Sequence, residues 1–322
     1  MGKRDNILIT LSKINGINLE TINKIPDSEI FSLKNEADIF NFINSNAAFN
    51  DHANRSFDEI KKAYNIAQLI KEGCKKAKIE IVTKFDDKYP ERFKKLSNYP
   101  PFFYAKGNCS ILKKTGIAII GTRFPSDKGK AWGRKLSEVI TGKGYTIISG
   151  LAAGCDSCAH IGCLRAGGET VAVMPTHLNN IYPSQNKKLF HDILDNNGCV
   201  ISEYELGHPM NQNDFILRDR LQAALAVGTI VIEAGITGGT MHAVNTTLQL
   251  KRPLAFLKFT EEHYAEFENA SANKSFLEND KALPIASSSD IDNFLNKCVA
   301  ADETSLTNVP GNNSVIAEQS LF

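Results

Sequence analysis

Two short apolar runs rich in β-branched residues each end at a glycine, and this pattern most constrains the fold. The first is Ile117-Ala-Ile-Ile-Gly-Thr-Arg123, and the second is Tyr145-Thr-Ile-Ile-Ser-Gly-Leu-Ala-Ala-Gly-Cys-Asp156. Each run predicts a buried strand that turns into a helix. About one strand–helix–strand unit separates the runs, so we expect both turns at one edge of a parallel sheet, with converging backbone N–H groups. Such an edge favours phosphate, and Arg123 adds a fixed positive charge.

Apolar runs alternate with helix-compatible segments from about residue 116 to residue 259. The expected strands are 117–120, 146–149, 170–174, 199–202, 229–233 and 254–259. This rhythm predicts the α/β class, with a Rossmann-like, doubly wound parallel sheet and a ligand crevice at the carboxyl ends of its strands. The G-x-G-x-x-G fingerprint is absent and no acidic residue ends the second strand, which argues against an NAD dehydrogenase.

We divide the chain into three parts. Residues 1–80 have apolar residues at helical spacing and predict a small N-terminal helical domain, of a SAM-like or helix-hairpin-helix-like kind. Residues 81–300 form the Rossmann-like core. It includes a lead-in from Phe85 to Gly107, whose prolines predict an ordered connector without regular structure. Residues 301–322 are polar and predict a disordered tail.

Composition bounds the class of protein. The chain has 322 residues, is 42% hydrophobic and contains seven cysteines. Without a long apolar run or a secretory pattern, it is expected to be a soluble cytoplasmic protein with reduced thiols and no membrane contact. The net charge of +1 hides a local asymmetry, because the stretch 104–135 has eight Lys or Arg residues and a single Asp. A basic cluster beside an expected anion site favours a polyanionic ligand.

The candidate ligand-binding residues lie at glycine turns and in polar loops. They are Gly121, Thr122, Arg123, Ser149, Gly150, Gly154, Asp156, Tyr182, Lys187, Arg218, Arg220, Gly238, Gly239 and Thr240. The glycines let the backbone approach a ligand, and those before Thr240 predict a further phosphate nest. Tyr182 can stack on a base or pack in the core. Lys187 lies in a first helical turn, where a helix prefers acids, which suggests a bound anion.

Arg218 and Arg220 are two positions apart and cannot share a helix face. One is therefore expected to pair with a carboxylate, while the other can reach the crevice.

Catalytic and metal-binding interpretations of residues 149–163 are weaker. Asp156 and His160 are four positions apart and could form a triad with Ser149, but no nucleophile-elbow sequence precedes them. Asp156 can simply cap its helix. The nearby cysteines and His160 spread too far around a helix to face one tetrahedral ion. We therefore expect no metal and no cofactor.

Several longer motifs occur in a fixed order along the chain. They are Ile117-Ala-Ile-Ile-Gly-Thr-Arg, Ser149-Gly-Leu-Ala-x-Gly-x-Asp with Ala159-His160, Gly168-x-Thr-x-Ala-Val, Ile181-Tyr-Pro-x-x-Asn-x-x-Leu, Ile201-Ser-Glu and Val231-x-Glu-Ala. Together with the segment from Tyr89 to Asn108, which overlaps the lead-in, these motifs resemble the DNA-processing protein A (DprA, or Smf) family over most of residues 7–297.

The resemblance implies a non-enzymatic protein that binds single-stranded DNA, forms a homodimer and helps load the RecA recombinase during natural transformation. By position, Arg123 and Lys187 would grip phosphates, and Gly121, Gly150 and Gly154 would shape the pocket.

The chain also departs from the family pattern. Asp219 stands where an amide is usual, and Thr237-Gly-Gly239 replaces a Ser-Gly-Ser stretch. Asp219 could weaken DNA binding or indicate another ligand. The tail is too short for the winged-helix domain of many members. Its last residues faintly resemble the pentapeptide that docks on the bacterial sliding clamp, which would give a weak clamp contact through Gln319–Phe322. A disordered end that happens to contain two apolar residues explains them better.

Two other function classes stay open. The first is a sensor or hydrolase of a nucleotide-derived small molecule on the same core. The phosphoribohydrolases that share this core have a glutamate three positions after the threonine of their glycine-rich motif, and here Ala243 stands there, which disfavours hydrolysis. A sensor needs no such carboxylate. The second is a protein-interaction scaffold that recruits partners through the N-terminal helices and the tail.

Overall fold

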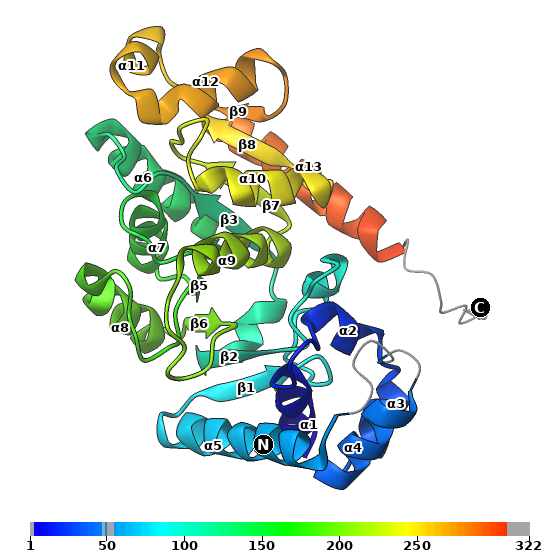
Figure 1. Ribbon diagram of the computed structural model, residues 1–322. Coiled ribbons are helices and arrows are strands. Elements are labelled where there is room, and N and C mark those ends of the chain that lie inside the picture. The colour runs from blue at the N-terminus through cyan, green and yellow to red at the C-terminus, as the bar shows by residue number, and fades with distance from the viewer. Residues whose placement is uncertain (1–2, 47–48, 50–54, 308–322) are drawn as a thin grey trace, which may run out of the picture.

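A computed structural model describes residues 3–46, 49 and 55–307, and these residues build one sheet with helices on both faces (Figure 1). Within them, nine strands pair in the order β1-β2-β6-β5-β4-β3-β7-β8-β9. The strands are β1 (Glu80–Thr83), β2 (Phe102–Gly107), β3 (Gly116–Ile120), β4 (Thr146–Ser149), β5 (Thr170–Val173), β6 (Cys199–Ser202), β7 (Gly228–Val231), β8 (Leu254–Leu257) and β9 (Leu283–Ile285). From β6 to β9 all pairs are parallel, whereas β1–β2 and β2–β6 are antiparallel. The predicted α/β class and Rossmann-like sheet are confirmed.

The central strands coincide with the apolar runs in the sequence. Every residue of β3, β4, β5, β6, β7 and β8 is buried. Strands of a parallel sheet are covered on both faces, so they appear as continuous apolar segments rather than as alternating ones. The six expected strands are found to within two residues at each end.

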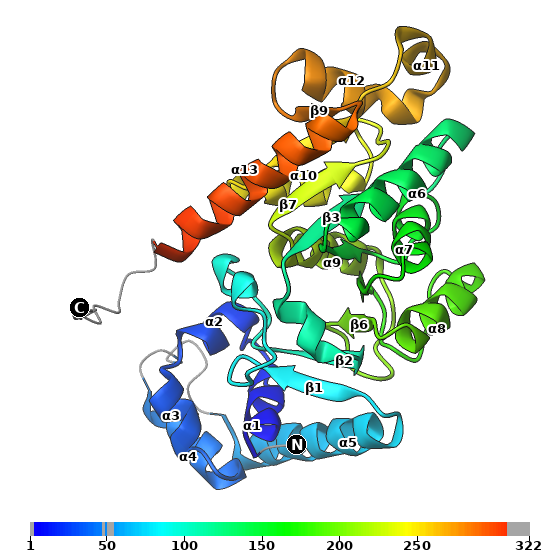
Figure 2. The ribbon, with the colours of Figure 1, turned by 180° about the vertical axis from the view of Figure 1, so that it is seen from behind.

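Different helices cover the two faces. Residues of α6 (Asp127–Gly142) and α7 (Cys155–Arg165) share a hydrophobic cluster with Ile117 and Ile119 of β3. Residues of α9 (Gln212–Leu225) share another hydrophobic cluster with Ala118, which lies between Ile117 and Ile119 in β3. The alternation of side chains along a strand explains this division. Accordingly, α9 lies in front of the sheet in Figure 1 and behind it in Figure 2. Two further helices follow β5 and β7, namely α8 (Lys187–Asp195) and α10 (Thr240–Gln249).

The N-terminal region is helical, as predicted. It consists of α1 (Lys3–Ser12), α2 (Leu19–Lys24), α3 (Asp27–Ser32), α4 (Glu36–Ser45) and α5 (Phe57–Lys76). A tight turn lies between α1 and α2, where Gly16 has a φ of 82° and the Asn18 side chain caps α2 through the Thr21 N–H. The core of these helices is continuous with Phe102 and Tyr104 of β2. The division into domains stays a prediction.

The lead-in differs from the expectation of irregular structure. Its residues include β2 and a 3₁₀ helix, η2 (Glu91–Lys95), and β2 pairs with β1 and β6 at the edge of the sheet. Pro100 and Pro101 precede β2, so they cost it no ladder hydrogen bond. The aromatic residues of β2 alternate between the faces: Phe103 belongs to the cluster around Tyr89 and Phe93.

The C-terminal part packs beyond β8. After α11 (Glu261–Glu266), η5 (Glu268–Ala270) and α12 (Ser271–Glu278), β9 adds the last strand, and α13 (Ser288–Thr307) follows. This last helix continues to Thr307, past Ala301, where we expected the polar tail to begin. At the other end of α13, Asp290 in the first turn accepts hydrogen bonds from the Ala286 and Ser287 N–H groups, which caps the start of the helix. The suggested clamp-binding segment, Gln319–Phe322, lies outside the described residues.

All seven cysteines are buried thiols without a disulfide partner. In the described part of the chain, no three His, Cys, Asp or Glu side chains are grouped as a metal site would require. None of the helices in these residues has the length and apolar character needed to cross a membrane.

Candidate functional site

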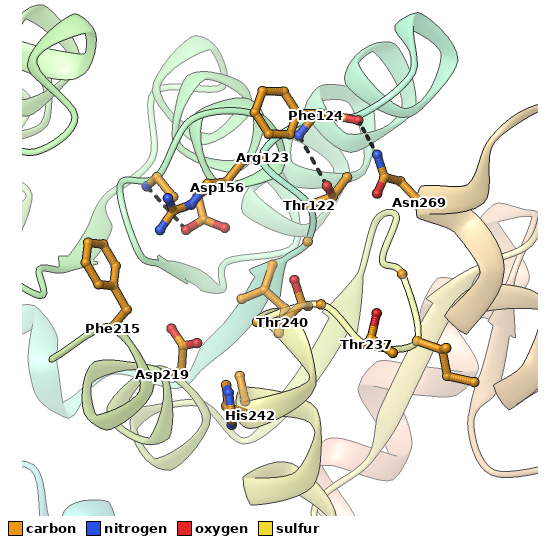
Figure 3. A pocket seen from close by; sticks show the side chains of 18 of the residues that line it. Thr122, Arg123, Phe124, Asp156, Phe215, Asp219, Thr237, Thr240, His242 and Asn269 are labelled. Carbon is orange, nitrogen blue, oxygen red and sulfur yellow. Dashed lines mark hydrogen bonds between the residues drawn. The ribbon is translucent and has the colours of Figure 1, made fainter. Parts of the chain in front are cut away.

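The strand order reverses beside β3, and this reversal positions the main pocket. From β3 the chain continues to β4 on one side, and β7 pairs with β3 on the other side. In such sheets the loops after the two strands diverge and leave a crevice at their carboxyl ends. A pocket of about 640 Å³ lies there, lined by the loop after β3, the loop after β7 and residues of α9 (Figure 3).

The two glycine turns of the sequence meet at this edge, as predicted. The Cys155 N–H at the start of α7 donates to the Thr122 carbonyl at 3.1 Å. Gly154 has a φ of 82°, and a Cβ there would lie 2.5 Å from the carbonyl oxygens of Thr122 and Arg123. Only glycine lets the turns approach so closely.

Glu233, which follows β7, anchors the loop after β3. Its carboxylate accepts hydrogen bonds from the Ser126 N–H at 2.7 Å, the Ser126 hydroxyl at 2.6 Å and His263 Nε2 at 2.8 Å. Its carbonyl accepts the Thr122 N–H at 2.7 Å. Ser126 in turn caps α6 through the Gly129 N–H. The loop that carries Arg123 is therefore fixed at both ends.

Arg123 lies at the junction of two pockets. A second pocket of about 220 Å³ adjoins the first, and Arg123 and Phe215 line both. The exposed Arg123 guanidinium lies 5.0 Å from the centre of the Phe215 ring, which is edge-on to Tyr182 at 5.5 Å. None of the described carboxylates forms an ion pair with Arg123, so its charge is available to a ligand.

Asp156 lines the large pocket, and Arg218 lines both pockets. One Asp156 oxygen accepts the Gly150 N–H at 3.1 Å and the Ala152 N–H at 3.3 Å. Burial raises the pKa of Asp156 to about 6, against the opposing charge of Arg218. Arg218 donates to the carbonyls of Gly150 and Val173, which ties together the ends of β4 and β5.

The two arginines of α9 face different surroundings. Arg218 lines both pockets and pairs with Asp219 at 2.9 Å. Arg220 points to Glu203 at 2.6 Å and lines neither pocket. Burial raises the pKa of Asp219, and Arg218 opposes that rise.

The glycine-rich loop after β7 forms the far side of the large pocket. Gly238, Gly239 and Thr240 line it together with His242 and Asn269. Gly239 precedes α10 without a side-chain cap, and a Cβ there would meet open space. A helix start of this kind presents backbone N–H groups and the positive end of the helix dipole.

The structure thus brings most of the fourteen candidate residues together. The large pocket is lined by eight of them: Gly121, Thr122, Arg123, Asp156, Arg218, Gly238, Gly239 and Thr240. The small pocket is lined by Gly150 and Tyr182, and also by Arg123 and Arg218. Four candidates line neither pocket. Gly154 lies in the turn packed against the carbonyls of Thr122 and Arg123. Ser149 is buried and donates to the Ile119 carbonyl, Lys187 is exposed at the start of α8 but lines neither pocket, and Arg220 is paired as described.

The sequence reasoning missed Phe124, Phe215, His242 and Asn269 as pocket residues. A phenylalanine next to the motif arginine was the one available signal. The triad interpretation also fails geometrically, because His160 is fully buried and bonds to Thr170 Oγ1 at 2.8 Å. Burial, and then Arg218, lowers its pKa to about 3, so the ring is neutral.

Comparison with known proteins decides the family. The sequence profile of the family "DNA recombination-mediator protein A" matches residues 80–296, which is more than half of the chain. The chain belongs to this family.

Similar proteins share this core. Protein Smf of Synechocystis sp. is 38% identical over 166 residues, which is 50% of this chain and 42% of that protein. DNA processing protein DprA of Streptococcus pneumoniae is 36% identical over 177 residues, or 54% of this chain and 60% of that protein. The chain therefore spans about half the length of these relatives.

Two solved structures match the fold. The DprA of Streptococcus pneumoniae superposes with a TM-score of 0.73 at 26% identity, covering 89% of this chain and 96% of that one. The DprA of Helicobacter pylori, whose structure was described for its single-stranded DNA binding mode, gives 0.60 at 27% identity, covering 69% and 96%.

Proposed function

We propose that the crevice at the ends of β3 and β7 binds single-stranded DNA and that the protein acts in recombination as a binder rather than as an enzyme. One observation carries the proposal: the Arg123 guanidinium, with which no described carboxylate pairs, lies where two pockets meet, between glycine turns and beside aromatic rings. A cation flanked by aromatic surface suits a strand with alternating phosphates and bases. The single-stranded DNA binding mode described for the Helicobacter pylori relative supports it.

Each part of the site has a role in this proposal. Arg123 contacts a phosphate bidentately, and the backbone at Gly239, where a Cβ would meet open space, leaves room for the strand to approach. Tyr182, half-exposed in the small pocket, offers a face to a base. Lys187, exposed beyond that pocket, would contact a second phosphate further along the strand.

The proposal includes two protein partners, the RecA recombinase and a second copy of this chain. Bound single strands would be protected and passed to the RecA recombinase, and two copies of the chain would form a homodimer. Cytoplasmic location and natural transformation as the pathway belong to it as well.

The test is a titration of labelled oligothymidylate at several salt concentrations. The logarithm of the binding constant should fall with the logarithm of salt by about 0.7 for each phosphate contacted. Arg123→Ala should weaken binding and reduce this slope by roughly one contact. Arg165→Ala is the matched control, because Arg165 is an exposed arginine at the C-terminal end of α7, whereas the pocket lies at the N-terminal end of that helix. Salt-independent binding by the wild-type protein would contradict the proposal.

A second candidate is a sensor of a free nucleotide. The volume of the large pocket suits a small molecule, and Asp219 adds a carboxylate to its wall. Ala243 lines this pocket at the position where a hydrolase would need an acid. Competition separates the candidates: displacement of the oligonucleotide by micromolar mononucleotide or NAD would favour the sensor.

A further inference from the structure

Phe124 has the most exposed large apolar side chain among the described residues, with 79% of its surface accessible. It follows Arg123 directly and lines both pockets. An apolar ring of this size gains nothing from contact with water, and its place at a ligand site gives the exposure a meaning that a scattered surface residue lacks.

The backbone holds Phe124 in this exposed position. Its N–H donates to Thr122 Oγ1 at 3.2 Å, and its carbonyl accepts from Asn269 Nδ2 at 3.2 Å. Pro125 follows, and then Ser126, which Glu233 anchors. The ring is therefore presented by a fixed loop, which lowers the entropy that a ligand must remove on binding.

The side chains of Arg123 and Phe124 diverge. Figure 3 shows Arg123 extending towards Phe215, whereas the Phe124 ring points away from Asp219 and His242 at the opposite side of the view. Two more exposed apolar residues, Ile216 and Ile236, also line the large pocket, at 43% and 53% exposure. The pocket thus combines a cationic centre with an apolar rim, a combination that matches a phosphate with a flat apolar group attached to it.

We infer that Phe124 is a base-stacking residue, on whose ring an unpaired nucleobase lies while an adjacent phosphate contacts Arg123. This inference rests on the proposed function and adds a second kind of contact to it. Stacking depends on the base, whereas the Arg123 contact depends on the phosphate, so the two can be measured separately.

The experiment compares oligothymidylate with an oligonucleotide of equal length made of abasic sites. Wild-type protein should prefer the thymidylate strand. Phe124→Ala should weaken binding of that strand by roughly 5- to 150-fold, the range for loss of one base–aromatic stack. It should leave the affinity for the abasic strand and the salt slope unchanged. Phe124→Trp should retain the preference, because it keeps an aromatic face.

Phe57→Ala is the matched control, since Phe57 is 41% exposed at the start of α5 in the N-terminal helices. Its affinities should equal those of the wild type. Thermal unfolding should show that Phe124→Ala folds normally.

The inference is overturned if Phe124→Ala binds thymidylate like the wild type, or if it loses affinity for both strands equally, as a protein-contact or structural role would predict. If wild type and Arg123→Ala follow the expected salt dependence while Phe124→Ala changes nothing, only the stacking role is wrong. If wild-type protein binds neither strand, the proposed function is wrong as well.

Discussion

Nε of Arg218 donates a hydrogen bond to Oδ1 of Asp219 at 2.9 Å, in the wall of the pocket. The family resemblance leads us to expect an amide at the position of Asp219. The ion pair means that its charge is largely compensated within the protein, while Gln222 donates to the same oxygen. Arg123 keeps its charge for the ligand, so an acidic residue in the wall is compatible with an anionic strand.

Asp219→Asn should strengthen DNA binding. The amide oxygen can still accept from Arg218, but the negative charge is gone, which we expect to tighten binding by about 1 kcal/mol, or roughly fivefold at low salt. Fluorescence anisotropy with oligothymidylate measures the change. The control is Asp292→Asn. Asp292 is a half-exposed residue of α13 that pairs with Lys143, and removing its charge should have no effect on DNA binding. Weaker binding by Asp219→Asn would instead assign the carboxylate to a different ligand.

The stability of the protein should depend on pH through Asp156. Its pKa in the folded protein, about 6, is above the ordinary 3.8, so the folded state binds more protons between these values. The free energy of unfolding, relative to that of Asp156→Asn, should therefore fall as pH rises from about 4 to 6 and stay constant above. A pKa difference of this size corresponds to about 3 kcal/mol. Urea unfolding across this range measures it.

Asp290 provides a control of opposite sign for that measurement. Hydrogen bonds from the Ala286 N–H and from Ser287 lower its pKa. The stability difference between wild type and Asp290→Asn should be present at neutral pH and be lost as pH falls below about 4. If both aspartates showed the same sign, burial would not be what controls Asp156.

Gly154→Ala should destabilise the protein more than Gly167→Ala. Both glycines have a positive φ, of 82° and 70°, which strains any residue that has a Cβ. Gly154 also has a ψ of −122°, outside the left-handed region that other residues can enter. A Cβ at Gly154 would also collide with the carbonyls of Thr122 and Arg123, whereas one at Gly167 meets open space. Denaturant unfolding compares the two. Equal losses would mean that the turns separate without cost.

Glu233→Gln should disturb the site without touching the ligand. The carboxylate accepts hydrogen bonds from Ser126 and His263, and an amide NH₂ in its place would face at least one of these donors. We expect a loss of about 1–3 kcal/mol of stability and weaker DNA binding, because the loop that carries Arg123 loses its anchor. Glu138→Gln, a partly buried carboxylate on α6, is the control for both measurements. Normal binding by Glu233→Gln would show that the loop keeps its shape without this anchor.

Local patterns in the sequence were enough for the sheet and its turns. Runs such as Ile117–Ile120 and Thr146–Ser149 are apolar throughout because both faces of a parallel strand are buried, so they stand out without knowledge of their neighbours. The glycines at 121 and 154 mark the bends because no other residue fits there. The strand Phe102–Gly107, second from the edge of the sheet, was missed, since its pairing with β1 and β6 is not local and prolines precede it.

The sequence by itself determined the order of the strands along the chain, the bends between them and the one arginine beside the first bend, because each depends on the conformational preferences of a few adjacent residues. Only the tertiary structure decided that Arg218 faces the pocket while Arg220 pairs with Glu203, that Ser149 and Lys187 lie outside both pockets, and that Phe124 stays exposed. These outcomes depend on which carboxylates, carbonyls and rings the fold brings near each side chain from distant parts of the chain, and no local pattern records them.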